Sequence, residues 1–163
     1  MMKAHDHFPM FIEARGHKVI LVGGGTIAER RIHTLAKFSF EITVLSDRIT
    51  ENLRKLRDEG RIRYIPGSFD PEEPAGHADL FADACMVLAC TDDRNVNSRI
   101  GAICKRRGIP VNLCDARDES TFWFPAIAAS DELVMGLVGN GRSHETVKKA
   151  AAKLRRIIEE RLF

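Results

Sequence analysis

The sequence lacks any long hydrophobic run. Its longest unbroken apolar stretch extends from Ala84 to Cys90, which is far shorter than the roughly 20 residues that a membrane-spanning helix requires. The first residues, Met1 to His7, are polar, and no apolar segment of a signal peptide follows them. We therefore expect no membrane association and a cytoplasmic location.

A large net charge is also missing. The chain has 25 Lys and Arg residues against 23 Asp and Glu residues, so its formal charge is only +2. That balance does not favour a nucleic-acid partner. With 44% hydrophobic and 29% charged residues among 163, the chain has the composition of a globular protein rather than a disordered one.

Cysteine motifs are absent as well. No two cysteines fall in a C-x-x-C pair, and no histidine pair has metal-ligand spacing on a helix, so we predict no metal site. In a cytoplasmic chain the cysteines are expected to be reduced and to behave as small buried hydrophobic side chains. The four are Cys85, Cys90, Cys104 and Cys114.

What the sequence does contain is a regular alternation of strand-like and helix-like segments. Strand patterns cover residues 18–22, 41–45, 61–65, 84–89 and 109–114, and helix patterns cover residues 26–38, 50–60 and 94–107. Strands that alternate with helices favour a parallel sheet covered on both faces. We therefore predict an α/β fold, a Rossmann-like doubly wound parallel sheet.

The pattern changes after Asp115. Residues 121–127 and 133–138 are two strand-like runs without a helix between them, so we expect a hairpin outside the parallel sheet. Such a strand at 133–138 would leave an unpaired edge in a monomer. Ser143 is a suitable cap for a last helix, in which apolar residues recur at helical spacing.

The sharpest motif is residues 23–28 (GGGTIA), which fit G-x-G-x-x-A between a predicted strand and a predicted helix. In this motif Gly23 would permit the tight turn, and Gly25 would let the backbone approach a pyrophosphate. The helix N-terminus would then offer unpaired N–H groups to the phosphates. We predict that Gly23, Gly24 and Gly25 bind a dinucleotide; the alternative is a purely structural glycine turn.

The end of the second strand bears on which cofactor is used. An acidic residue about 20 positions after the glycine turn can bind the ribose 2′-OH of NAD, and Asp47 stands 22 residues after Gly25. Arg48 could instead accept the 2′-phosphate of NADP. We favour NAD, with the alternative that Asp47 is only a loop or capping residue.

Further polar residues follow the later strands. Thr91 and Asp92 come directly after residues 84–89, where ligands of doubly wound sheets bind. Asp92 or Asp93 could instead cap the following helix. Asp115 follows the fifth strand, where it could act as a general base or remain a turn-forming residue.

Taken together, these motifs resemble the precorrin-2 dehydrogenase family of sirohaem synthesis. The resemblance covers nearly the whole chain. It is carried by residues 8–12 (FPMFI), 16–19 (GHKV), 22–31 (VGGGTIAERR), 89–93 (ACTDD), 96–97 (VN), 111–115 (VNLCD) and 122–126 (FWFPA).

The resemblance implies an NAD-dependent oxidation of the tetrapyrrole precorrin-2 to sirohydrochlorin. It places Asp115 at the catalytic aspartate and puts Thr26, Ile27, Asp47 and Arg48 at cofactor contacts. Some members are also ferrochelatases, so a sirohydrochlorin metal chelatase that shares the cleft is one alternative. A non-catalytic module that binds NAD or a tetrapyrrole is another.

The resemblance also implies how the chain is divided. It predicts an NAD-binding Rossmann domain over residues 1–115 and a strand-crossing dimerisation segment over residues 116–142, and hence a homodimer. Residues 143–163 would form a C-terminal helix, a shortened form of the family's helical domain. Gly139 departs from the pattern, because some members carry a serine there.

Overall fold

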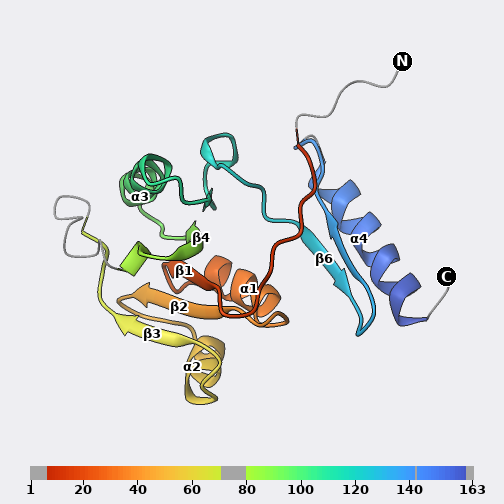
Figure 1. Cartoon of the computed structure of the whole chain (residues 1–163), viewed down its shortest axis with the longest axis horizontal. Coiled ribbons are helices and arrows are strands. Elements are labelled where there is room, and N and C mark those ends of the chain that lie inside the picture. Colours follow the sequence, from red (N-terminus) through yellow and green to blue (C-terminus); the bar gives the residue numbers. More distant parts are fainter. Residues whose placement is uncertain (1–6, 71–79, 142, 161–163) are drawn as a thin grey trace. The chain divides into compact units, whose positions relative to one another are not determined.

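The computed structural model describes residues 7–70, 80–141 and 143–160. They belong to two compact units (Figure 1). The larger unit covers residues 13–123 and contains the parallel sheet. The smaller unit joins the N-terminal residues up to Ile12 to the residues from Phe124 onward.

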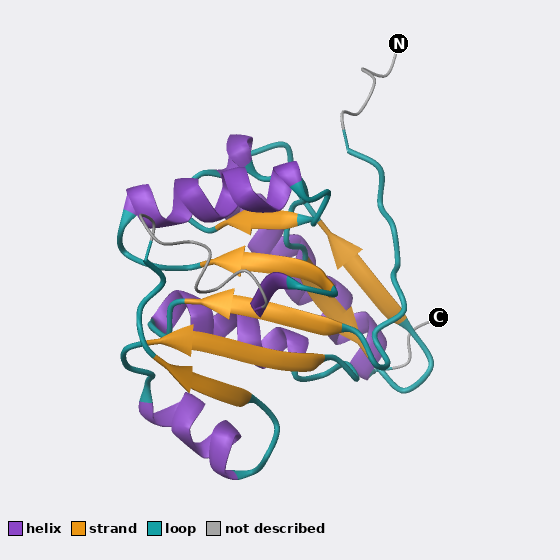
Figure 2. Ribbon diagram, turned by 60° about the vertical axis from the view of Figure 1, so that its left-hand side comes forward, coloured by secondary structure: helices purple, strands orange, loops and turns teal. Residues whose placement is uncertain are grey.

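The larger unit is built on a five-stranded sheet with the strand order β3-β2-β1-β4-β5. Every pair of neighbouring strands is parallel, as Figure 2 shows. The strands are β1 (Lys18–Val22), β2 (Glu41–Ser46), β3 (Arg63–Pro66), β4 (Ala84–Ala89) and β5 (Val111–Leu113). This arrangement confirms the predicted Rossmann-like α/β fold.

Both faces of the sheet are covered. Successive strand residues point to opposite faces, yet Val19, Ile20 and Leu21 in the middle strand are all fully buried. The continuous β-branched and aliphatic character of β1 is therefore the sequence signature of a doubly covered parallel strand.

In the described part of this unit, three α-helices connect strands of the sheet. They are α1 (Thr26–Leu35), α2 (Glu51–Asp58) and α3 (Arg94–Arg106), and the Thr50 hydroxyl caps α2 by accepting a hydrogen bond from the Leu53 N–H. Helix α1 is shorter than predicted. Beyond Leu35, Lys37 and Phe38 donate to carbonyls three residues back rather than four, which tightens the chain into turns.

The smaller unit contains an antiparallel hairpin of β6 (Ala126–Ala129) and β7 (Val134–Leu137), followed by α4 (His144–Glu159). Ser143 caps α4 by accepting a hydrogen bond from the Thr146 N–H at 3.1 Å. Arg155 on α4 donates to the Ile127 carbonyl of β6 at 3.0 Å. The hairpin and the capped last helix were both predicted.

The predicted start of that hairpin at Thr121 was wrong. The Thr121 hydroxyl accepts the Val111 N–H at 2.7 Å, and the Thr121 N–H donates to the Val111 carbonyl at 2.8 Å. The Ser120 hydroxyl accepts the Leu113 N–H at 2.9 Å. This segment, which follows the short helix η2 (Arg117–Glu119), therefore covers the open edge of β5 instead of starting a strand.

None of the helices among the described residues is both long enough and apolar enough to cross a membrane.

Candidate functional site

The candidate site lies at the carboxyl edge of the parallel sheet. Val22 pairs with both Leu45 and Ala89, and Ala89 pairs with Leu113, so the ends of β2, β1, β4 and β5 lie in register. The segments that follow these strands carry every predicted site residue. The strand order reverses between β1 and β4, and ligands of doubly wound sheets bind outside such a reversal.

The turn after β1 requires glycine at two positions. Gly23 has φ +105°, and a Cβ there would lie 2.5 Å from the Cys90 carbonyl oxygen. A Cβ on Gly24 would meet the Arg48 carbonyl oxygen and would lie 2.7 Å from a methyl group of Ile49. Glycine at these positions lets the turn pass tightly between the ends of β2 and β4.

Gly25 differs from its two neighbours. It has an ordinary φ of −80°, and a Cβ there would meet nothing within 4 Å. It occupies the N-cap of α1 without a capping side chain, and Thr26 and Ile27 beside it are exposed. The first N–H groups of α1 and the positive end of its dipole therefore face open space, which fits the pyrophosphate of a dinucleotide.

The loop after β2 is held in place by hydroxyl groups while its own charges stay exposed. The Ser68 hydroxyl donates to the Asp47 carboxylate, and the Ser46 hydroxyl donates to the Arg48 carbonyl at 2.8 Å. Asp47 and Arg48 are both exposed. Both side chains are thus presented at the strand end, where a ribose would be recognised.

A polar network ties the glycine turn to α2. The Thr50 N–H donates to the Gly24 carbonyl at 3.2 Å, and the Asn52 amide donates to the Glu29 carboxylate at 2.8 Å. Hydrogen bonds from Thr50 and Asn52 lower the pKa of Glu29. These contacts fix the first turn of α1 relative to the end of β2.

The turn after β4 is organised by Asn97. This side chain is fully buried; its oxygen accepts the Thr91 N–H at 3.2 Å, and its amide donates to the Thr91 carbonyl at 3.0 Å. The Thr91 hydroxyl also lies 2.7 Å from the Asn97 oxygen. Of the two acids that could cap α3, Asp93 does so by accepting the Asn95 N–H at 2.7 Å, which leaves Asp92 exposed.

This role of Asn97 was not predicted from the sequence. The sequence does carry a sign of this role. Asn97 is a polar residue on the inward-facing side of the helix, three positions before the buried Ile100 and seven before the buried Cys104. A buried amide at such a position needs partners, and the backbone of the preceding turn supplies them.

Asp115 lies just after β5, with Arg94 of α3 beside it. An Arg94 guanidinium nitrogen lies 3.8 Å from an Asp115 carboxylate oxygen, and the two side chains are 45% and 33% exposed. Arg94 also pairs with Glu119. A carboxylate oxygen at this strand end is a group that can accept a proton. No pattern in the sequence pointed to Arg94.

Two cysteines also meet at this edge. Their sulfur atoms, in Cys90 after β4 and Cys114 after β5, lie 2.7 Å apart. Cys90 and Cys104 are buried as expected, but Cys85 and Cys114 are partly exposed, so the expectation that all four are buried was wrong for those two.

The cysteine pair has an unusual electrostatic setting. A hydrogen bond from Cys90 lowers the pKa of Cys114, and the guanidinium of Arg31 on α1 acts in the same direction, whereas Asp115 opposes it. Within the described ranges, no three His, Cys, Asp or Glu side chains are grouped so that they could hold a metal ion.

Comparison with known proteins gives a consistent result. The model of a family described as "Putative NAD(P)-binding" matches residues 10–126. The "Probable multifunctional siroheme biosynthesis protein HemA" of Ruminiclostridium josui is 35% identical over 154 residues, which are 94% of this chain and 28% of that protein. The "Siroheme synthase" of Methylobacillus flagellatus is 31% identical over 153 residues, 94% of this chain and 31% of that protein.

The chain therefore spans less than a third of the length of these two relatives. Among solved structures, "SirC, precorrin-2 dehydrogenase" is similar in fold, with a TM-score of 0.73 and 21% identity. That similarity covers 92% of this chain and 70% of the other. The names of these proteins agree with the family resemblance seen in the motifs.

Proposed function

The chain belongs to the NAD(P)-binding family, and from that premise we propose that it oxidises precorrin-2 to sirohydrochlorin with NAD as cofactor. One observation carries the proposal. The N-terminus of α1, which no side chain caps, follows β1 and the glycine turn. The carboxylate of Asp115 follows β5 at the same edge of the sheet. The relatives named for sirohaem synthesis support the choice of substrate.

The cofactor would be held mainly by backbone. In this proposal the segment of Gly23, Gly24, Gly25, Thr26 and Ile27 receives the pyrophosphate, because Gly25, Thr26 and Ile27 are exposed at the start of α1. When bound, NAD supplies a hydride acceptor.

Asp47 is the proposed partner of the ribose 2′-OH, which favours NAD over NADP. Its exposed carboxylate follows β2, and the Ser68 hydroxyl donates to it. Arg48 is exposed at the next position and is the residue through which NADP would be accepted instead.

Asp115 is the proposed general base. Loss of a hydride and a proton from the substrate requires a group that can receive the proton, and a carboxylate oxygen of Asp115 can do so. Arg94 lies beside this carboxylate, 3.8 Å from one of its oxygens. Thr91, held by Asn97, and the exposed Asp92 would line the cleft between this base and the glycine turn.

The proposal extends to the arrangement of the whole protein. We infer a cytoplasmic homodimer with residues 1–115 as the NAD-binding domain, 116–142 as the dimerisation segment and 143–163 as the C-terminal helix, of which residues 161–163 lie outside the described ranges. In support, the β6–β7 sheet has only two strands among the described residues, and Val134 and Val138 are each 41% exposed. Unpaired strand edges beside exposed apolar side chains favour pairing with another chain.

The decisive experiment follows absorbance after the purified chain is mixed with enzymatically generated precorrin-2, with and without NAD. We expect the sirohydrochlorin spectrum to appear only with NAD. If the spectrum does not change while calorimetry still detects NAD binding, the chain is a binding module and the proposal fails. Insertion of ferrous iron into sirohydrochlorin without NAD, and without oxidation of precorrin-2, would identify the chelatase instead.

A further inference from the structure

We propose that Cys90 and Cys114 are a site of reversible disulfide modification at the edge of the sheet. A small-molecule disulfide such as glutathione disulfide is the oxidant. This inference concerns a covalent change that the proposed dehydrogenase reaction does not use.

The backbone already places the two cysteines as a disulfide requires. Ala89 and Leu113 are register partners on the parallel strands β4 and β5, and the Cys114 N–H donates to the Ala89 carbonyl at 2.9 Å. The next residues, Cys90 and Cys114, are therefore neighbours across two strands. Neighbouring strands lie about 4.8 Å apart, within the roughly 4.4–6.8 Å between Cα atoms that a disulfide spans.

The side chains are placed equally well. The two sulfur atoms are 2.7 Å apart, and both cysteines are free thiols. A disulfide needs a separation of about 2.05 Å. Closing the bond therefore requires a small side-chain adjustment and no rearrangement of the sheet.

The environment assigns different roles to the two sulfurs. Cys114 is partly exposed, receives a hydrogen bond from the Cys90 thiol and lies beside the guanidinium of Arg31. A thiolate is the reactive form, and a nearby cation stabilises it. Cys90 is only 8% exposed. Cys114 is thus the attacking sulfur, and Cys90 is the resolving one.

The chemistry balances as two thiol–disulfide exchanges. The Cys114 thiolate attacks one sulfur of glutathione disulfide, which forms a mixed disulfide and releases one glutathione thiolate. Cys90 then loses its proton and attacks the Cys114 sulfur, which releases the second glutathione. The two cysteines lose two electrons, and the glutathione disulfide gains them as it becomes two thiols that take up the two protons.

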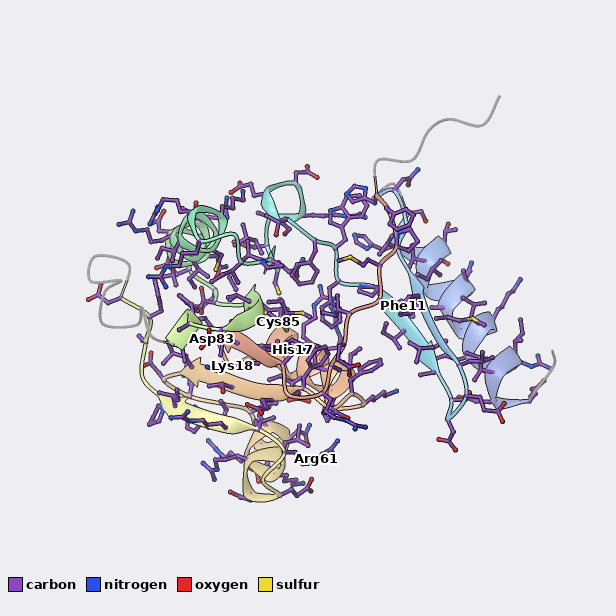
Figure 3. All side chains as sticks on the ribbon, in the orientation of Figure 1. Phe11, His17, Lys18, Arg61, Asp83 and Cys85 are labelled. Atoms are coloured by element: carbon purple, nitrogen blue, oxygen red, sulfur yellow. The ribbon has the colours of Figure 1, made fainter. Side chains whose placement is uncertain are left out.

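The remaining cysteines provide internal controls. Burial raises the pKa of Cys104 to about 11 and also raises that of Cys85. Cys85, labelled in Figure 3, is the second residue of β4 and so lies at the opposite end of this strand from Cys90. Neither has the partly exposed, cation-stabilised thiolate that makes Cys114 reactive.

The modification would act on the residues that follow each cysteine. Thr91 comes directly after Cys90, and Asp115 comes directly after Cys114. A covalent link between the two strand ends constrains the turns that carry Thr91 and Asp115, and misplacing a proton acceptor slows catalysis. We therefore expect the oxidised protein to lose precorrin-2 oxidation, a consequence that rests on the proposed function.

The test uses the full chain in buffers with a rising ratio of glutathione disulfide to glutathione. After free thiols are blocked, trypsin separates Cys114 (residues 108–117) from Cys104 (residues 100–105) and from Cys85 and Cys90 (residues 64–94). We expect mass spectrometry to find residues 64–94 linked to residues 108–117, lighter by two hydrogen atoms, and to lose this species after dithiothreitol.

Two variants identify the partners. Cys85→Ser should retain the linked species, because Cys85 shares the tryptic peptide with Cys90 but is not the proposed partner. Cys114→Ser should abolish it. Full alkylation of Cys90 and Cys114 in the wild type at every ratio, or a link that disappears in Cys85→Ser, would overturn the proposal.

Activity is followed separately on the same samples. Loss of precorrin-2 oxidation in step with the linked species, and its recovery with dithiothreitol, support the effect on the site. If the reduced protein has no activity but the link still forms, the proposed function fails while the modification site stands.

Discussion

At the residue scale, Asp115 tests the proposed chemistry most directly. We expect Asp115→Asn to lower kcat for precorrin-2 oxidation by about 10²- to 10⁴-fold, because an amide cannot accept the proton. The dissociation constant of NAD, measured by calorimetry, should change little. The matched control is Asp118→Asn, an exposed aspartate of η2. Equal losses in both variants, or full activity in Asp115→Asn, would exclude Asp115 as the base.

Substitutions at Gly24 and Gly25 should affect different properties of the protein, its stability in the first case and its cofactor affinity in the second. A Cβ on Gly24 would overlap the Arg48 carbonyl and Ile49, so Gly24→Ala should lower the free energy of unfolding by about 1–3 kcal/mol. A Cβ on Gly25 would meet nothing in the protein, so Gly25→Ala should unfold like the wild type but bind NAD more weakly. Denaturant titration and calorimetry on both variants check this. Unchanged NAD affinity in Gly25→Ala would argue that the turn is only structural.

The acidity of Cys114 makes a prediction about pH. The hydrogen bond from Cys90, helped by Arg31 and opposed by burial and by Asp115, lowers the pKa of Cys114 to about 7. Because the thiolate forms as pH rises through that value, the rate of Cys114 alkylation by iodoacetamide should rise between about pH 6 and 8 and then level off. Cys104, with a pKa of about 11, should stay slow throughout. Peptide mapping of timed reactions measures both rates.

At the element scale, Asn97 connects a helix to the turn that it packs against. Asn97→Ala should lower the free energy of unfolding by about 1–3 kcal/mol, because it leaves the Thr91 N–H and carbonyl without their partner. Asn95→Ala is the control, since Asn95 is exposed on the same helix. Thermal or denaturant unfolding distinguishes them, and equal stability of the two variants would contradict this role for Asn97.

The elements also show which parts of the structure could be predicted. The strand 18–22 and the strand 84–89 have the predicted bounds, because continuous apolar runs that end at polar turn residues specify buried parallel strands. The glycine turn was equally predictable, because its spacing follows from one local geometry.

Other features depended on contacts that are distant in sequence. Thr121 looks like a strand residue, but its hydroxyl and backbone pair with Val111, ten positions earlier. The approach of Arg94 to Asp115 and the meeting of Cys90 with Cys114 arise from strand order. The local sequence pattern does not say which strand ends become neighbours. These contacts of the site therefore could not be predicted without the three-dimensional fold.

At the scale of the whole molecule, the proposed homodimer makes assembly and stability depend on protein concentration. Val134 begins β7 and is 41% exposed in a sheet of only two strands. We expect the wild-type chain to sediment at twice 18.3 kDa and its unfolding midpoint to rise with concentration.

Val134→Lys should shift the protein towards the monomer, because a charged side chain on an edge strand opposes pairing. Ala152→Lys places the same charge on an exposed position of α4 and should leave the dimer intact. Analytical ultracentrifugation over a hundredfold range of concentration measures both variants. A wild-type chain that stays monomeric throughout that range would refute the proposed homodimer. Unaltered assembly of Val134→Lys would exclude β7 as the contact.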